Sequence, residues 1–126
     1  MRVLIAPDSY KGTLTSVDVA RALAEGWLRA RPDDELRLAP LADGGEGTMV
    51  AIEAAGGWER IEADVHDPLG RVIRATWLRR EDRTAAMVEM AAASGLSRLT
   101  ADERDAVRAT SAGTGDLVVA ALDAGV

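Results

Sequence analysis

The 126-residue sequence contains no cysteine and no phenylalanine, and it has only one histidine and one tyrosine. Without cysteine, a disulfide framework, a thiol nucleophile and a cysteine-based metal site are all excluded. Three tryptophans complete the aromatic set, so alanine, leucine and valine must fill the core. Lys11 is the only lysine among 15 basic residues. A bias towards arginine explains this ratio, and under such a bias Lys11 marks a position that suits a compact ammonium group.

Long apolar runs are also absent, since no stretch approaches the roughly 18 residues of a membrane span. The formal net charge of −6 argues against nucleic acid as a partner, because a phosphate backbone needs a positive face. The first residues lead directly into a strand pattern and leave no room for a signal peptide, so we expect a cytoplasmic location. Hydrophobic residues at 48% and charged residues at 29% are typical of a soluble globular domain.

The first 55 residues alternate between strand and helix patterns. Residues 2–6 predict a buried strand and residues 35–40 a second one. Thr15 and Asp18 have the spacing of a capping box, which predicts that a helix starts there, and a second helix is expected at 48–55. This order predicts a parallel, doubly wound α/β sheet, which binds ligands beyond the carboxyl ends of its strands. The apolar stripe of the first helix consists of Val19, Ala20, Leu23, Ala24, Trp27 and Leu28.

From Trp58 onwards the pattern changes to strands joined by short turns, which favours an antiparallel or mixed sheet. A short helix is predicted at 100–107, and a hydroxyl-rich loop at 110–116 leads into a final helix. We place a domain boundary between residues 68 and 69. The predicted strands of this half are residues 58–65, 71–78 and 84–90.

Residues 41–48, with the sequence Leu-Ala-Asp-Gly-Gly-Glu-Gly-Thr, connect a predicted strand to a predicted helix. Glycine lets the backbone come close to a ligand, and a helix start offers N–H groups to an anion. Asp43 and Glu46 repel a bare phosphate, but they suit a divalent cation or a substrate hydroxyl. The same glycines also suit a tight turn without a ligand, so both interpretations stay open. The polar loop at 7–13 is expected at the same sheet edge.

Four segments share the pattern of one family: residues 5–12 (Ile-Ala-Pro-Asp-Ser-Tyr-Lys-Gly), residues 41–48, residues 88–96 (Val-Glu-Met-Ala-Ala-Ala-Ser-Gly-Leu) and residues 110–117 (Thr-Ser-Ala-Gly-Thr-Gly-Asp-Leu). Together they resemble the N-terminal part of bacterial-type glycerate kinases. The resemblance implies a Rossmann-like domain, here residues 1–68, interrupted by an inserted α/β domain that starts at residues 69–126, with the active site between them. Family members are much longer than this chain. Tyr10 stands where the family pattern has phenylalanine.

The resemblance implies transfer of the γ-phosphoryl group of ATP, with Mg²⁺, to a hydroxyl of D-glycerate. Lys11 would supply charge to the phosphoryl group or to the glycerate carboxylate, and Asp8 would orient Lys11, hold metal or accept a proton. Asp43 and Glu46 are the tentative metal ligands. The residues expected to bind substrate or phosphate are Asp43, Gly44, Gly45, Glu46, Gly47, Thr48, Ser94, Thr110 and Thr114.

Each of these residues also has a structural interpretation. An Asx turn accounts for Asp8, helix capping accounts for the acidic residues, and caps and turns account for the hydroxyl residues. His66, in a turn, is expected to be structural or solvated rather than a general base. The isolated chain is expected to be inactive, and homo-oligomerisation is left open. Two alternatives to a kinase segment are a non-catalytic phosphate- or nucleotide-binding module of flavodoxin-like shape and a truncated product without an independent role.

Overall fold

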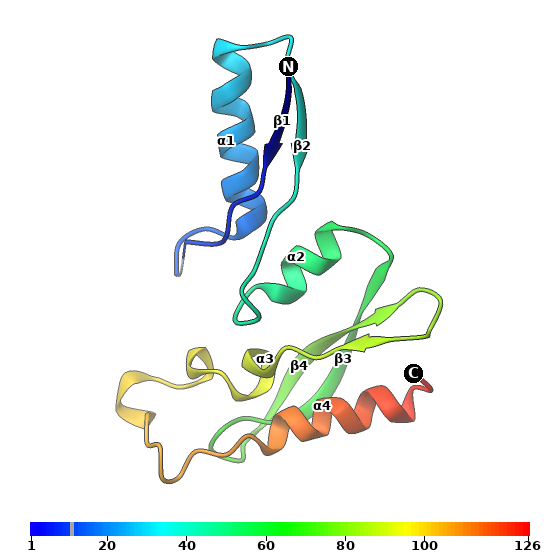
Figure 1. The fold of residues 1–126 in the computed structure, drawn as a ribbon. Coiled ribbons are helices and arrows are strands. Elements are labelled where there is room, and N and C mark those ends of the chain that lie inside the picture. The colour runs from blue at the N-terminus through cyan, green and yellow to red at the C-terminus, as the bar shows by residue number, and fades with distance from the viewer. Residues whose placement is uncertain (11) are drawn as a thin grey trace. The chain divides into compact units, whose positions relative to one another are not determined.

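The computed structural model describes residues 1–10 and 12–126 (Figure 1). The chain forms two compact units, Met1–Gly56 and Gly57–Val126. This division lies twelve residues before the boundary expected at 68/69, which falls in the turn between two paired strands. Because that pairing holds both strands together, the turn is internal to the second unit.

The first unit contains two strands and two helices, in the predicted β-α-β-α order. Its parallel pair was predicted: Arg2 is opposite Glu35, and Ile5 is opposite Leu38. In Figure 1, α1 runs alongside this pair of strands. The elements are β1 (Arg2–Ile5), α1 (Ser16–Ala30), β2 (Glu35–Leu38) and α2 (Thr48–Ala54).

The start of α1 uses the predicted capping pair in a modified form. Thr15 Oγ1 accepts a hydrogen bond from the backbone N–H of Asp18 at 3.2 Å. The Asp18 carboxylate, at 2.6 Å, accepts one from the Thr15 hydroxyl instead of reaching back to the backbone. The helix therefore begins where the sequence predicts, and the N–H of Asp18 in its first turn is bonded to a side chain.

The apolar stripe of α1 is only partly buried, contrary to the sequence expectation. Val19 and Ala20 are buried, whereas Leu23 is 52% exposed. Leu4, expected in a buried strand, is 62% exposed. The sheet of this unit has only two strands, so it covers only part of the apolar stripe.

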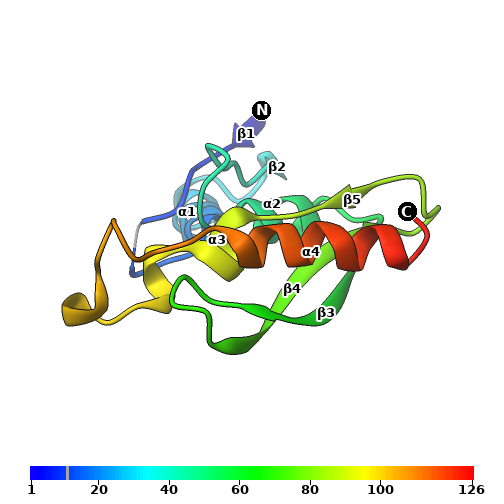
Figure 2. The same cartoon turned by 90° about the horizontal axis from the view of Figure 1, so that it is seen from below.

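The second unit contains an antiparallel sheet in the order β3-β4-β5, with Trp58 opposite Arg80 and His66 opposite Val72. In Figure 2, α4 runs along the β3–β4 hairpin. Two short 3₁₀ turns, Leu96–Arg98 and Ala101–Glu103, separate the last two helices. The elements are β3 (Trp58–His66), β4 (Val72–Arg80), β5 (Ala86–Met87), α3 (Met90–Ser94) and α4 (Ala112–Asp123).

Three predictions for this unit were wrong in extent. The third strand is only Ala86–Met87, and the helix expected at 100–107 is only the 3₁₀ turn at Ala101–Glu103. The loop expected at 110–116 is largely helical, because α4 already begins at Ala112. The core of the unit is formed by the buried residues Val65, Ala75, Trp77, Leu78, Ala92, Ala93, Leu99, Leu117 and Ala121.

Candidate functional site

Backbone pairing in the first unit continues beyond the ends of β1 and β2. The N–H of Ala39 donates to the carbonyl of Ile5, and the N–H of Leu41 donates to the carbonyl of Pro7, both at 2.9 Å. These bonds hold the two chain segments side by side up to the point where each enters its loop. The segments that lead to Asp8 and to Asp43 therefore leave the same edge of the sheet, at the carboxyl ends of the parallel strands.

Short-range bonds shape the glycine loop. Asp43 Oδ1 accepts the N–H of Gly45 at 3.0 Å, and the Thr48 hydroxyl donates to the carbonyl of Gly45 at 2.8 Å. Gly44 and Gly47 have φ values of +96° and +91°, a region that side chains rarely enter. Asp43 thus closes an Asx turn with one oxygen, while Gly44 and Gly47 provide the backbone shape.

The remaining site residues of the first unit are exposed. Asp8 is exposed and accepts the N–H of Ser9 at 2.6 Å. Glu46 is exposed as well. Lys11 lies outside the described residues. Within residues 1–10 and 12–126 the structure contains no group of three or more His, Asp or Glu side chains that could hold a metal.

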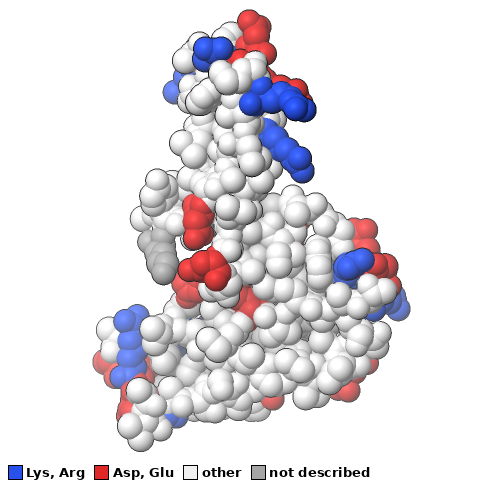
Figure 3. Space-filling model, in the orientation of Figure 1, with Lys and Arg blue, Asp and Glu red and all other residues white. Residues whose placement is uncertain are grey.

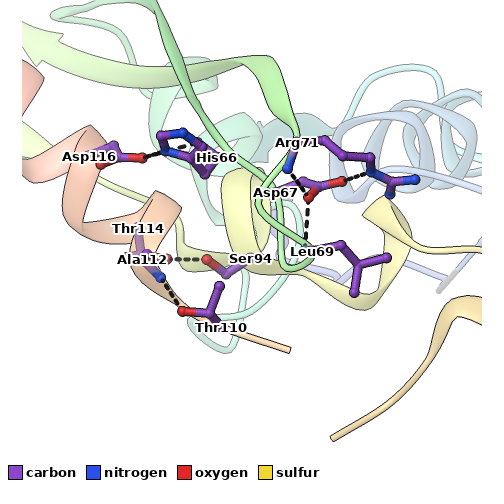
Figure 4. A network of polar contacts seen from close by, with 9 residues as sticks. All are labelled: His66, Asp67, Leu69, Arg71, Ser94, Thr110, Ala112, Thr114 and Asp116. Atoms are coloured by element: carbon purple, nitrogen blue, oxygen red, sulfur yellow. Dashed lines mark hydrogen bonds and ion pairs between the residues drawn. The ribbon is translucent and has the colours of Figure 1, made fainter. Parts of the chain in front are cut away.

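In the second unit, two of the predicted substrate-binding residues meet. The hydroxyls of Ser94 and Thr114 lie 2.8 Å apart in a half-buried contact between α3 and α4 (Figure 4). Thr110 has a different role: its hydroxyl accepts the N–H of Ala112 at 3.2 Å at the start of α4, and its own N–H donates to the carbonyl of Pro68 at 2.9 Å. The cap-and-turn interpretation therefore describes Thr110.

A His66–Asp116 pair links the end of β3 to α4 and was not found from the sequence. Asp116 Oδ2 accepts the backbone N–H of His66 at 3.0 Å and lies 2.8 Å from His66 Nδ1 (Figure 4). The side-chain hydrogen bond from His66, followed by the backbone one, lowers the pKa of the Asp116 carboxyl. Fifty residues separate the partners, so no local pattern could reveal the pair; its one signal was that Asp116 belongs to the 110–117 segment.

A second network fixes the turn after β3. The buried Asp67 carboxylate accepts the N–H groups of Leu69 and Arg71 at 2.8 and 2.9 Å and also binds the Arg71 guanidinium. Burial raises the pKa of Asp67, but the hydrogen bonds from Arg71 and Leu69 outweigh it and hold that pKa below its ordinary value. Arg71 also binds Glu103 at 2.6 Å, which ties the 3₁₀ turn at 101–103 to the hairpin.

The sequence model described as "Glycerate kinase family" matches residues 3–126. The chain belongs to the glycerate kinase family. This confirms the resemblance drawn from the four segments and the α/β fold class.

The glycerate kinase relatives are similar over nearly all of this chain. It is 44% identical over 125 residues to a glycerate 2-kinase of Escherichia coli K12 and 42% identical over 125 residues to a glycerate kinase of Bacillus subtilis 168. Each alignment covers 99% of this chain and 33% of the relative. A crystal structure from Salmonella typhimurium LT2, described as that of a glycerate kinase 2, matches with a TM-score of 0.82 at 44% identity, covering 100% of this chain and 34% of that one. The chain therefore spans about a third of the length of these glycerate kinases.

Some of the charged side chains of this glycerate kinase segment are paired across its antiparallel strands. On β3 and β4, Arg79 binds Glu59 at 2.7 Å and Arg74 binds Asp64 at 3.1 Å. On the face drawn in Figure 3, some basic side chains lie next to carboxylates, while other carboxylates lie apart from any side chain drawn blue. No helix in the described part of the chain is long and apolar enough to cross a bilayer.

Proposed function

We propose that this chain supplies part of the active site of a cytoplasmic glycerate kinase, which transfers the γ-phosphoryl group of ATP to a hydroxyl of D-glycerate. Family membership supports the reaction class, and the backbone bonds that hold the Asp8 and Asp43 segments at one sheet edge support the location. Parallel α/β sheets bind their ligands at this edge. The pairing of Leu41 with Pro7 is the single observation that carries the proposal.

Phosphoryl transfer requires positive charge on the transferring group, a metal that bridges phosphate oxygens, and an oriented hydroxyl. We assign the positive charge to Lys11, the only ammonium side chain in the sequence, acting on the phosphoryl group or on the glycerate carboxylate. Asp8, three residues earlier, would orient Lys11 or contact the bound metal. The glycine loop at 43–48 would bind the substrate or its phosphate.

The acidic residues of this loop fit Mg²⁺. Mg²⁺ in kinases is usually held by one or two carboxylates together with phosphate oxygens and water, so a larger protein cluster is not needed. Asp43 uses Oδ1 for its turn and keeps Oδ2, and Glu46 is exposed in the same loop. These two residues would hold the ion. When bound, it would neutralise charge on the phosphates.

In the second unit, Ser94 at the end of α3 and Thr114 near the start of α4 would contact the substrate, and Thr110 would shape that end of α4. We propose that the two units, Met1–Gly56 and Gly57–Val126, correspond to the beginning of one domain and the beginning of an inserted one. Neither part is expected to catalyse alone.

A chimera tests the proposal. These 126 residues replace the matching third of the Bacillus subtilis glycerate kinase, and ADP release is measured with glycerate, ATP and Mg²⁺. Turnover that depends on glycerate supports the proposal, and no turnover from a folded chimera contradicts it. The isolated chain is expected to give no turnover. If it binds nucleotide by calorimetry while the folded chimera stays inactive, the chain is a binding module instead.

A further inference from the structure

Helix α4 is apolar on both its inner and its outer side. On the inner side, Leu117 and Ala121 are buried in the core of the second unit. On the outer side, Val118 is 46% exposed, Val119 55% and Leu122 65%. Spacings of three and four residues place these side chains next to one another on the helix surface. We define the outer stripe of α4 as its exposed residues Gly115, Val118, Val119 and Leu122.

The outer stripe lacks the charged residues that a water-facing helix side normally carries. The other long helix of the chain, α1, has them: Arg21 and Glu25 are four residues apart and both exposed. Within α4 the only charged residues are Asp116, which is bonded to His66, and Asp123, the last residue of the helix. A helix that is apolar on all sides is typical of a protein interior, and a contiguous exposed apolar patch marks a contact surface.

Gly115 makes the outer stripe accessible to close packing. A Cβ added to Gly115 would meet no heavy atom within 4 Å, so the space in front of the backbone is open there. Val118 and Val119 lie one turn further along the same stripe. A chain segment that crosses α4 at this point can therefore touch the backbone of Gly115 and pack against two branched side chains at once.

The length of the related kinases indicates what covers the outer stripe. Nearly all of this chain aligns with the Escherichia coli and Bacillus subtilis relatives, yet it covers only a third of each. The Salmonella typhimurium structure likewise contains this fold as about a third of a longer chain. In such a kinase, about two thirds of the polypeptide remain available to pack on α4.

A second copy of this chain fits the outer stripe less well. A specific dimer buries roughly 800 Å² on each partner and uses about 20–30 residues a side. The outer stripe has four residues on about two turns of one helix, which is too small for self-association on its own. A segment of a longer kinase chain does not face this minimum, because linkage within one polypeptide raises its effective concentration at the stripe.

We propose that the outer stripe of α4 is the contact surface for an uncharged, apolar segment from the remaining two thirds of a glycerate kinase polypeptide. Burial of the valine and leucine side chains would stabilise the contact. Because the stripe carries no charge, no charged group on it loses its hydration when the segment packs. The contact does not depend on which residues act in phosphoryl transfer.

Cysteine labelling tests the contact. The chain has no cysteine of its own, so Val119→Cys introduces a single thiol in the outer stripe. A maleimide is added to the isolated variant and to the same variant of the chimera with the Bacillus subtilis glycerate kinase, and peptide mass spectrometry follows the label at position 119. We expect labelling to be roughly tenfold slower or more in the chimera. Glu25→Cys, on the charged side of α1, is the matched control and should react equally fast in both proteins.

Equal labelling rates at position 119 would overturn the proposal. Slow labelling already in the isolated chain would overturn it as well, and faster labelling on dilution would then identify a second copy as the occupant. Turnover is not needed for this readout. Protection of position 119 in a folded but inactive chimera therefore supports the contact and refutes the proposed function, whereas an active chimera without protection does the reverse.

A charge placed on the outer stripe gives a second measurement. Val119→Glu should leave the Tm of the isolated chain nearly unchanged, because the side chain is exposed there. In the chimera the same substitution would bury an unpaired carboxylate and should lower the Tm by several degrees. A chimera whose Tm is shifted no more than that of the isolated chain would contradict the contact.

Discussion

Gly113 of α4 lies directly against the backbone carbonyl of His66, with space for a hydrogen atom but not for a methyl group. A Cβ added to Gly113 would be 1.7 Å from the carbonyl oxygen, whereas one added to Gly115, in the same helix, would meet no heavy atom within 4 Å. The φ angle of Gly113 is not in the left-handed region, so its backbone conformation does not require glycine. Glycine is needed here because only a residue without a Cβ lets α4 come this close to the end of β3.

Gly113→Ala is predicted to destabilise the second unit by roughly 3 kcal/mol or more, because either α4 or the end of β3 must move. Gly115→Ala is the matched control and should stabilise the unit by about 0.5–1 kcal/mol through helix propensity. Urea denaturation of both variants measures the difference. Equal effects would show that the contact is not needed for packing.

Asp34 makes the stability of the first unit depend on pH. Its carboxylate accepts hydrogen bonds from the N-terminal ammonium at 2.8 Å and from the Trp27 indole at 3.0 Å. These contacts lower the pKa of Asp34 from 3.8 to about 2, with the ammonium having the larger effect and the indole the smaller one. The pKa of Asp34 is lower in the folded chain than in the unfolded chain. Its contacts therefore stabilise the folded unit fully above pH 3.8, and this stabilisation is lost as the pH falls to about 2.

Exchange of the Trp27 indole proton, followed by NMR between pH 2 and 6, reports on this unit. Exchange, corrected for its intrinsic pH dependence, should accelerate in the unsubstituted chain as the pH falls below 4, and Asp34→Asn should remove most of that dependence. Asp33→Asn is the control. A pH dependence unchanged in Asp34→Asn would contradict the assignment.

Asp67→Ala is predicted to cost roughly 3 kcal/mol of unfolding free energy, because hydrogen bonds to a charged, buried acceptor are lost and two backbone N–H groups lose their partner. The exposed Asp82 accepts the N–H of Thr84 in a similar turn at 2.9 Å, and Asp82→Ala should cost much less stability than Asp67→Ala because water replaces the lost contact. Thermal unfolding compares the two variants. A smaller loss in Asp67→Ala than in Asp82→Ala would contradict the role of burial.

Local patterns predicted the first unit well because its determinants are close in sequence. Thr15 and Asp18 form the helix cap, and the alternation of strand and helix fixed the parallel pairing of β1 with β2. The exposure of Leu23 was not predictable in the same way. A period of 3.6 shows which face of a helix is apolar, but not how much sheet is present to cover it.

The second unit depends on contacts between distant residues, and the sequence was correspondingly less informative. The Thr-Ser-Ala-Gly-Thr-Gly run has the composition of a loop, yet it is helical from Ala112 because Gly113 packs on His66. The same packing aligns Asp116 with His66, fifty residues away. Of the candidate site, the edge position of the two loops was predictable from topology, whereas the His66–Asp116 pair was not.

Asp43→Asn in the chimera is the most direct test of the central claim that the acidic glycine loop acts in phosphoryl transfer. Asparagine keeps an oxygen for the Gly45 N–H and so preserves the turn, but it removes the charge. Asp18→Asn, in the cap of α1, is the control. We predict a loss of roughly 100-fold or more in kcat/KM for Asp43→Asn with unchanged thermal stability. Activity within threefold of the unsubstituted chimera would contradict the claim.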